Sequence, residues 1–233
     1  MRKLKMRNVY IILLVVFSTI GCSNLTDIDG NGYETIAIGN QVWMAENLKV
    51  THYRDGTEIT NVTDNAAWSN LSTEAYCYYD NKSSNGDTYG ALYNWYAVND
   101  SRNIAPEGWH VPTDAEWKEL EMYLGMSQSE ADDTGYRGTN EGSKLAGNAD
   151  LWDSGSLESD SEFGYSGFSA LPGGYRYYTS GSYSHLGYRG YFWSATEGSS
   201  LSAWYRSLFC ISSDIDRDYY GKRHGFAVRL LRD

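Results

Sequence analysis

The clearest pattern of hydrophobic and polar positions predicts a helix at residues 113–124. The segment follows a proline and opens with Thr-Asp-Ala-Glu, a capping box in which threonine and glutamate each bond the other's backbone N–H. Trp117, Leu120 and Leu124 then share one helical face, and a glycine follows as a common helix stop. The spacing of apolar residues in 91–98 predicts a second helix.

Other segments alternate with the period of a strand. Residues 33–42 predict two strand segments joined by a Gly-Asn turn, and residues 75–79 predict a short strand that ends in the turn-rich run 80–87. Alternation in residues 204–211 and 226–231 predicts strands in the last third of the chain. Two main helices and a mostly antiparallel sheet joined by Gly- and Ser-rich loops indicate a loop-rich α+β domain.

The N-terminal residues have the features of an export signal. Four basic residues precede an apolar run at residues 9–20, and Gly-Cys follows. The run is too short for a spanning helix, which needs about 20 residues. The segment resembles a lipoprotein signal, so we expect residues 1–21 to be removed and lipid to be attached to Cys22; the alternative is an ordinary signal with an incidental cysteine. Residues 22–32 would form a short tether and residues 33–233 a single domain.

Charge argues against nucleic acid as a partner. The chain carries 19 Lys and Arg against 30 Asp and Glu, a net charge of −11. Removal of the signal takes away four basic and no acidic residues, which makes the mature chain still more acidic. Such a charge repels phosphate backbones. The expected location is the cell envelope, on a membrane at the outer membrane, the cell surface or the periplasmic face.

Two cysteines remain in the mature chain, Cys77 and Cys210. An exported protein can keep a disulfide. Cysteine also packs well as a small buried hydrophobe with a free thiol. The residues alone leave both arrangements open.

Several segments form a distinctive series over nearly all of the mature chain, including Gly-Trp-His-Val-Pro-Thr-Asp-Ala-Glu-Trp and Gly-Phe-Ser-Ala-Leu-Pro-Gly-Gly-Tyr-Arg. The segments are residues 29–31, 38–48, 76–81, 89–97, 108–117, 167–176, 192–197 and 225–229. Together and in this order they resemble the Fibrobacter succinogenes major paralogous domain family. The family often has a cysteine after its final Val-Arg, where this chain has Leu230. If the cysteine of Tyr-Cys-Tyr usually pairs there, the resemblance implies that Cys77 needs Cys210 as its partner.

The Pro-Thr-Asp-Ala-Glu-Trp and Gly-Phe-x-Val-Arg segments are also similar to the formylglycine-generating enzyme family. That resemblance implies a C-type-lectin-like fold, but a fold does not carry a function. The oxidase of that family needs a copper-binding cysteine pair near its C-terminus, and soft thiolates are what hold Cu(I). Only Cys210 lies in that region. We therefore expect no catalytic residues, cofactor or metal.

Two runs of alternating acidic residues have the spacing of calcium ligands. Asp27, Asp29 and Asn31 match the first ligand positions of a calcium loop, but Ile38 stands where the bidentate glutamate belongs. Residues 214–218 alternate in the same way. The expectation for the first run is Asx turns.

The most suggestive stretch for binding is residues 175–191, which mixes tyrosine, serine and glycine. Tyrosine gives rigid contact area at a low cost in entropy, and serine and glycine adapt to a ligand. The candidate binding residues are Tyr177, Tyr178, Tyr183, His185 and Tyr188. The alternative is that these tyrosines only close the core.

These observations predict a non-catalytic, membrane-anchored envelope lipoprotein that acts as a binding module for a glycan or a protein partner. One alternative is a structural or assembly component of a cell-surface complex. Another is a divergent oxidase of the formylglycine-generating type.

Overall fold

The computed structural model describes residues 25–233. The predicted signal, the Gly-Cys junction and Cys22 lie outside the described residues. Within them, no helix is both long and apolar enough to cross a membrane.

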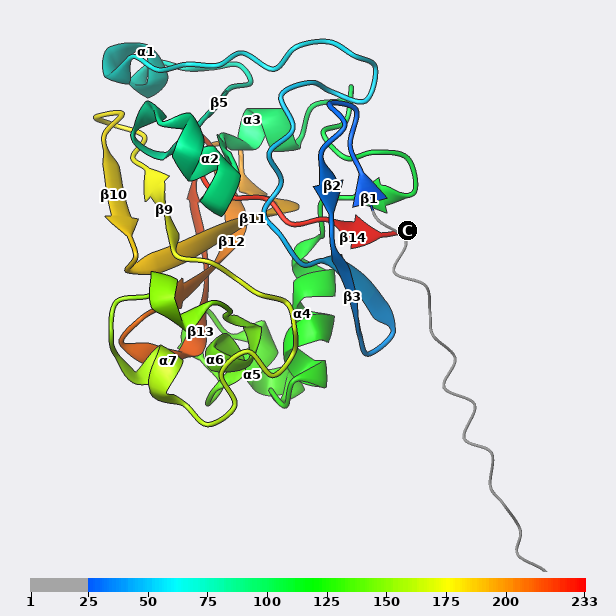
Figure 1. Cartoon of the computed structure of the whole chain (residues 1–233), viewed down its shortest axis with the longest axis vertical. Coiled ribbons are helices and arrows are strands. Elements are labelled where there is room, and N and C mark those ends of the chain that lie inside the picture. Colours follow the sequence, from blue (N-terminus) through cyan, green and yellow to red (C-terminus); the bar gives the residue numbers. More distant parts are fainter. Residues whose placement is uncertain (1–24) are drawn as a thin grey trace, which may run out of the picture.

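The described chain contains helices and strands in mixed order (Figure 1). The strands are β1 (Leu25–Thr26), β2 (Gly32–Tyr33), β3 (Thr35–Ile38), β4 (Gln41–Met44), β5 (Tyr76–Cys77), β6 (Leu92–Tyr93), β7 (Trp109–His110), β8 (Gly135–Arg137), β9 (Gly173–Arg176), β10 (Tyr183–Leu186), β11 (Arg189–Ser199), β12 (Ser202–Phe209), β13 (Ser212–Gly221) and β14 (Leu231–Arg232). The helices are α1 (Asn65–Ser69), α2 (Ser83–Tyr89), α3 (Trp95–Val98), α4 (Asp114–Tyr123), α5 (Gln128–Asp132), α6 (Glu141–Leu145) and α7 (Ser156–Ser159), with 3-10 turns η1 (Tyr79–Asn81) and η2 (Ala149–Leu151).

A six-stranded sheet in the order β10-β9-β11-β12-β13-β8 forms the centre, and a four-stranded sheet in the order β3-β4-β14-β7 lies beside it. Pairs of neighbouring strands are antiparallel except β9 and β11, which are parallel. Figure 1 shows α1, α2 and α3 at one end of the sheets and α5, α6 and α7 at the other. The predicted loop-rich α+β class with mostly antiparallel strands is confirmed, whereas the likeness to C-type lectins stays a prediction.

The capped helix is α4, as predicted. The hydroxyl of Thr113 accepts the backbone N–H of Glu116 (3.3 Å), and the carboxylate of Glu116 accepts the N–H of Thr113 (2.7 Å). Trp117, Leu120 and Leu124 are buried on one face. The hairpin predicted at residues 33–42 is also confirmed, as β3, a turn and β4.

Two local predictions are wrong. The run 80–87 is predicted to form turns, yet it contains most of α2. This helix packs so closely on the ring of Tyr78 that a side chain at Gly86 would collide with it. The helix expected at 91–98 begins only at Trp95, because Leu92 belongs to a strand that pairs with Cys77. Of the two predicted main helices, one is therefore a single turn.

The segment 226–231 is buried along both of its faces. Phe226, Val228 and Leu230 belong to one hydrophobic cluster, and Ala227 and Leu231 belong to a second. The predicted alternation is therefore real, but it separates two cores instead of a core from water. The segment joins its neighbours through isolated bridges, and regular pairing begins only at β14.

Buried ion pairs fix α4 to the central sheet. Arg206 of β12 donates to Asp114 (2.8 Å) and Glu121 (2.5 Å), which lie on α4. Arg217 of β13 donates two bonds to Asp114 (2.9 and 2.7 Å), and Arg137 of β8 donates one to Glu121 (2.8 Å). Burial would raise the pKa of Asp114, but the bonds from Arg217 and Arg206 lower it to about 2. Removing one partner from such a group leaves an unpaired buried charge.

The two cysteines are free thiols in different hydrophobic clusters. Cys77 packs with Trp68 and Tyr79, and Cys210 packs in the cluster that contains Trp117. Burial raises the pKa of both thiols. Of the two arrangements that the sequence left open, the structure has the buried free thiols, and the Cys77–Cys210 disulfide that the resemblance implied is not formed.

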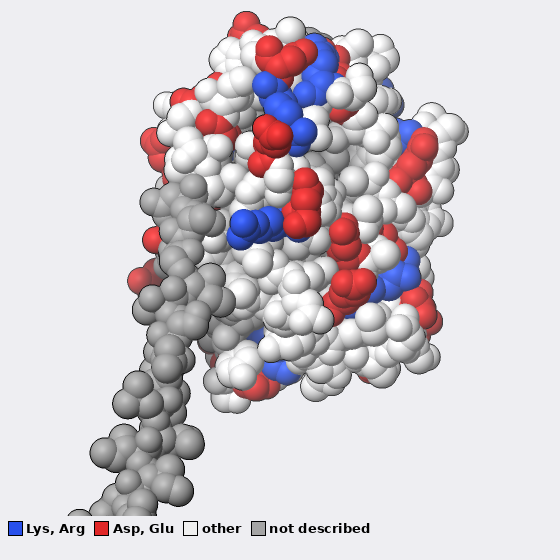
Figure 2. Space-filling view, turned by 90° about the vertical axis from the view of Figure 1, so that its right-hand side faces the viewer, with Lys and Arg blue, Asp and Glu red and all other residues white. Residues whose placement is uncertain are grey.

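Charged side chains are dispersed over the surface seen in Figure 2. Acidic and basic groups there lie next to each other and are separated by uncharged surface. Described surface on this face carries no continuous basic area, in keeping with the net charge of −11.

Candidate functional site

A cleft lined mainly by tyrosine side chains lies where the β11–β12 hairpin turns and β13 ends. It has a volume of about 540 Å³ and takes its lining from four segments that are distant in sequence. We call it the tyrosine cleft, and it is lined by Tyr96, Tyr177, Tyr178, Ser199, Leu201, Ser202, Tyr219, Tyr220, Gly221, Lys222, Arg223 and His224.

The register of the central sheet places two of these rings. Tyr219 and Tyr220 of β13 pair with Trp204 and Ala203 of β12. The ring of Tyr219 meets that of Trp204 edge-on at a centroid distance of 5.4 Å. The ring of Tyr220 stacks on that of Tyr205 at 4.9 Å. Both rings are thus supported from beneath, and they remain 53% and 42% exposed.

His224 forms the floor of the tyrosine cleft and is only 2% exposed. Its ring stacks on Tyr220 (4.8 Å between centroids) and lies against Tyr178 (4.7 Å). Its Nδ1 lies 3.0 Å from the carbonyl oxygen of Gly221, so Nδ1 carries the proton and donates it. Burial lowers the pKa of His224 to about 4, and the charge of Arg223 adds to the effect. The floor is therefore a neutral aromatic ring at neutral pH.

Tyr177 and Tyr178 reach the cleft from a well-supported hairpin between β9 and β10. The backbone N–H of Gly181 donates to the carbonyl of Tyr177 (2.9 Å). Buried Arg176 donates to the carbonyls of Gly181 (2.8 Å) and Thr63 (3.0 Å), which fastens the hairpin to a neighbouring loop. These bonds hold the two tyrosines in place before any ligand arrives.

Of the five tyrosine and histidine residues predicted for binding, the structure brings only Tyr177 and Tyr178 into this cleft. Tyr183 donates from its hydroxyl to Asn81 (2.6 Å), and its ring packs against Tyr79. Tyr183 therefore lies outside the tyrosine cleft and closes a small hydrophobic cluster.

His185 and Tyr188 also face the core side of the hairpin. His185 Nδ1 lies 3.1 Å from the hydroxyl of Tyr191, and burial lowers the pKa of His185. The ring of Tyr188 packs on Phe209 at 4.7 Å. The contacts of His185 and Tyr188 therefore fit the alternative interpretation, in which the stretch 175–191 closes the core.

Sequence reasoning missed the other half of the cleft. Tyr219 and Tyr220 lie next to each other at the end of a strand, and Lys222, Arg223 and His224 follow as a basic run. An adjacent pair of tyrosines cannot both enter one core from a strand, because successive side chains point to opposite faces. The adjacent pair of tyrosines therefore predicts that at least one of the two rings is exposed.

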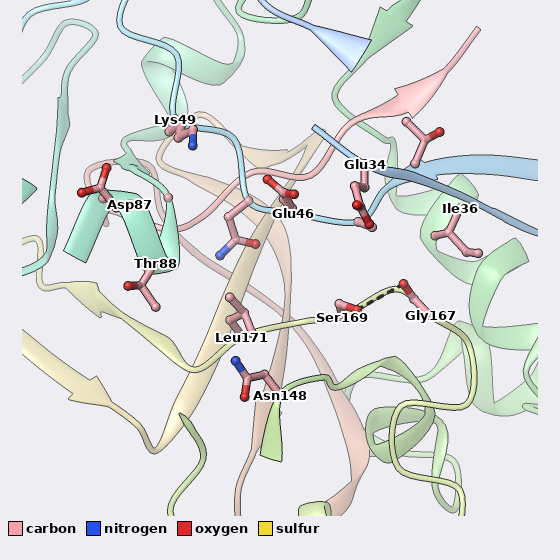
Figure 3. A pocket seen from close by; sticks show the side chains of 15 residues that line it. Glu34, Ile36, Glu46, Lys49, Asp87, Thr88, Asn148, Gly167, Ser169 and Leu171 are labelled. Carbon is pink, nitrogen blue, oxygen red and sulfur yellow. Dashed lines mark hydrogen bonds between the residues drawn. The ribbon is translucent and has the colours of Figure 1, made fainter. Parts of the chain in front are cut away.

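A second hollow, the polar cleft, has a volume of about 480 Å³ and a different lining. Glu34, Glu46 and Lys49 lie along one side, and Asn148 and Ser169 come from the other (Figure 3). Its lining includes three carboxylates and one lysine, without an aromatic ring. The tyrosine cleft offers more apolar area with convergent polar groups, which is the usual composition of a ligand site.

The acidic runs have structural roles in the described chain. Asp27 accepts the backbone N–H groups of Asp29 (3.0 Å) and Asn31 (2.9 Å), which are the predicted Asx turns. Asp216 is buried in β13 and accepts the hydroxyl of Tyr205 (2.9 Å). Within residues 25–233 no group of histidine, cysteine, aspartate and glutamate side chains is arranged to hold a metal ion.

Comparison with known proteins identifies a family for nearly the whole described chain. The model of the Fibrobacter succinogenes major domain matches residues 36–232. No curated protein and no solved structure matches the chain. The matched region includes both sheets, α4 and the tyrosine cleft. The chain therefore belongs to the Fibrobacter succinogenes major domain family.

Proposed function

We propose that this protein is a non-catalytic binding module of the bacterial cell envelope, anchored by lipid on Cys22, and that the tyrosine cleft binds carbohydrate. The observation that carries the proposal is the exposure of two tyrosine rings at one cleft, Tyr177 and Tyr220. Leu201, which is also exposed, extends the same surface. Exposed apolar groups that gather on one surface mark interaction sites.

The chemistry of the cleft suits sugar rings. Tyrosine offers an apolar face for stacking and a hydroxyl for hydrogen bonds. Ser199 and Ser202 add two further hydroxyl groups to the lining. His224 stays neutral above its pKa of about 4 and is nearly inaccessible, which argues for a support under the tyrosine rings and against a general base.

The alternatives have less support. The exposed rings could also contact an envelope protein, since tyrosine is enriched at protein interfaces. The oxidase alternative requires a pair of cysteines that bind copper together. Cys77 and Cys210 do not form such a pair, because they lie in different hydrophobic clusters. We therefore keep the glycan as the proposed ligand and treat a protein partner as an outcome of the test.

The test is a glycan array probed with the detergent-solubilised full chain. Tyr177→Ala and Tyr220→Ala should each weaken retention at least tenfold, about 1.4 kcal/mol, as hot-spot aromatics do. Tyr165→Ala is the matched control, because Tyr165 is a 74% exposed tyrosine that does not line the cleft.

Retention that neither cleft variant changes would refute the cleft as the site. If no glycan is retained and an envelope protein co-purifies with the wild type but not with Tyr220→Ala, the assembly alternative replaces the proposal. Thermal unfolding of each variant shows whether a loss of binding reflects a loss of folded protein.

A further inference from the structure

The charges around the tyrosine cleft run against those of the chain as a whole. The chain has 30 acidic and 19 basic residues, yet no aspartate or glutamate lines the cleft. Two cationic side chains do, Lys222 and Arg223. An opening of this kind in an acidic surface favours the approach of an anion.

The two cations are not equivalent. Lys222 is buried, forms an ion pair with Glu197 and donates to the carbonyl of Ser200 (3.1 Å). Its charge is therefore balanced. Arg223 donates from Nη1 to the carbonyl of Ser69, and no carboxylate of the described chain lies within 4.0 Å of its guanidinium. Arg223 is the cation that a ligand can neutralise.

Arg223 is also placed beside the stacking surface. Its guanidinium carbon lies 5.4 Å from the centre of the Tyr178 ring. The charge of Arg223 also acts on His224 at the floor of the cleft, because it lowers the pKa of His224 in addition to the effect of burial. The carboxylate of Asp218 lies next in sequence to the lining, where it accepts the backbone N–H of Tyr219 (2.8 Å). The cleft thus combines stacked rings, hydroxyl groups and one unbalanced guanidinium.

From this juxtaposition we infer that the ligand is an acidic glycan, with its sugar rings on the cleft tyrosines and a uronic-acid carboxylate on Arg223. The guanidinium presents a planar pair of donors that matches a carboxylate. The inference rests on the proposed function and deepens it, since it names the class of glycan. A neutral sugar would leave Arg223 without an anionic partner in the bound state.

The experiment compares oligogalacturonate with its methyl ester, which keeps the same rings and removes the charge. Titration calorimetry with the detergent-solubilised full chain at low salt should give at least tenfold tighter binding of the acid. Added salt should weaken binding of the acid and leave the ester unchanged. Dextran sulfate and polyglutamate serve as probes for a sulfate and for an acidic peptide.

Two arginine variants assign the effect. Arg223→Gln should remove the preference for the acid, so that acid and ester bind with equal affinity. Arg232→Gln is the control, because Arg232 is an exposed arginine of β14 that does not line the cleft. If Arg223→Gln lowers the melting temperature, the wild-type protein provides the test instead: added salt should weaken its binding of the acid and not its binding of the ester.

Each outcome separates the inference from the proposed function. Equal binding of acid and ester, or a preference that Arg223→Gln leaves intact, overturns the acidic glycan while carbohydrate binding stands. Binding of dextran sulfate alone overturns the carboxylate, and equal binding of polyglutamate overturns the sugar. If no glycan binds, acidic or neutral, the proposed function itself has failed.

Discussion

Lowering the pH from 7 to 5 should destabilise this protein through His224, and His224→Phe should remove that part of the destabilisation. The side chain is 2% exposed and packed between tyrosine rings, and burial lowers its pKa from 6.5 to about 4. Between these two values the unfolded chain binds a proton that the folded protein does not bind. The stabilisation is therefore complete above pH 6.5 and is lost progressively as the pH falls towards 4.

The two pKa values set the size of the effect. A pKa lowered from 6.5 to about 4 corresponds in full to about 3 kcal/mol, since each pKa unit is worth about 1.4 kcal/mol. At pH 5 the unfolded histidine is almost entirely protonated and the folded one is mostly neutral, so about 2 kcal/mol of the free energy of unfolding should already be gone. A loss of that size is a large part of the stability of a typical domain.

The assay is urea unfolding of wild type and His224→Phe at several values between pH 7 and pH 5. Phenylalanine keeps a flat ring against Tyr178 and Tyr220 but cannot be protonated. Burial raises the pKa of Asp216, which works in the opposite direction, so the difference between the two proteins is the quantity to compare. His185→Phe should remove a smaller part of the pH dependence, because burial also lowers the pKa of the half-buried His185. Parallel pH curves for wild type and His224→Phe would refute the reasoning.

Three further outcomes are expected. Thr113→Ala should lower the free energy of unfolding by about 1 kcal/mol, measured in urea, since it removes half of the capping box; an unchanged midpoint would contradict that role. Cys77 and Cys210 should both react with an alkylating reagent in the denatured, unreduced protein, and mass spectrometry showing neither modified would contradict free thiols. Cys22→Ser should abolish incorporation of an acyl label and move the protein from membrane to soluble fractions, so continued membrane retention would disprove the anchor.

Local patterns in the sequence predicted the elements whose contacts are local. The α4 helix is an example, because its capping box and its apolar face all lie within residues 113–124. The α2 helix was missed because the run 80–87 is rich in turn-forming residues, and no local propensity reveals that the run packs against Tyr78 through Gly86. Tertiary packing there overrides a sequence typical of turns.

The ion-pair group beneath α4 could not be predicted for a similar reason. Arg206 and Glu121 are separated by 85 residues, and Arg217 and Asp114 by 103. The sequence shows charged residues but not which of them are buried together. The candidate site divides in the same way: Tyr177 and Tyr178 stood out by composition, whereas Tyr220 joins them only through the register of β12 and β13, and His224 only through the turn after β13.

The buried segment 226–231 has a consequence for how the chain reaches its native state. Met44 and Leu48, from the early part of the chain, donate their backbone N–H groups to Leu230 and Val228 (both 2.9 Å). These early residues cannot form their bonds until the chain has been synthesised beyond Leu230, because their partners lie far along the sequence. Pairings so far apart in sequence form slowly. Until then the segment 226–231, which separates the two hydrophobic clusters, is missing from the core. The incompletely folded chain therefore remains accessible to chaperones and proteases.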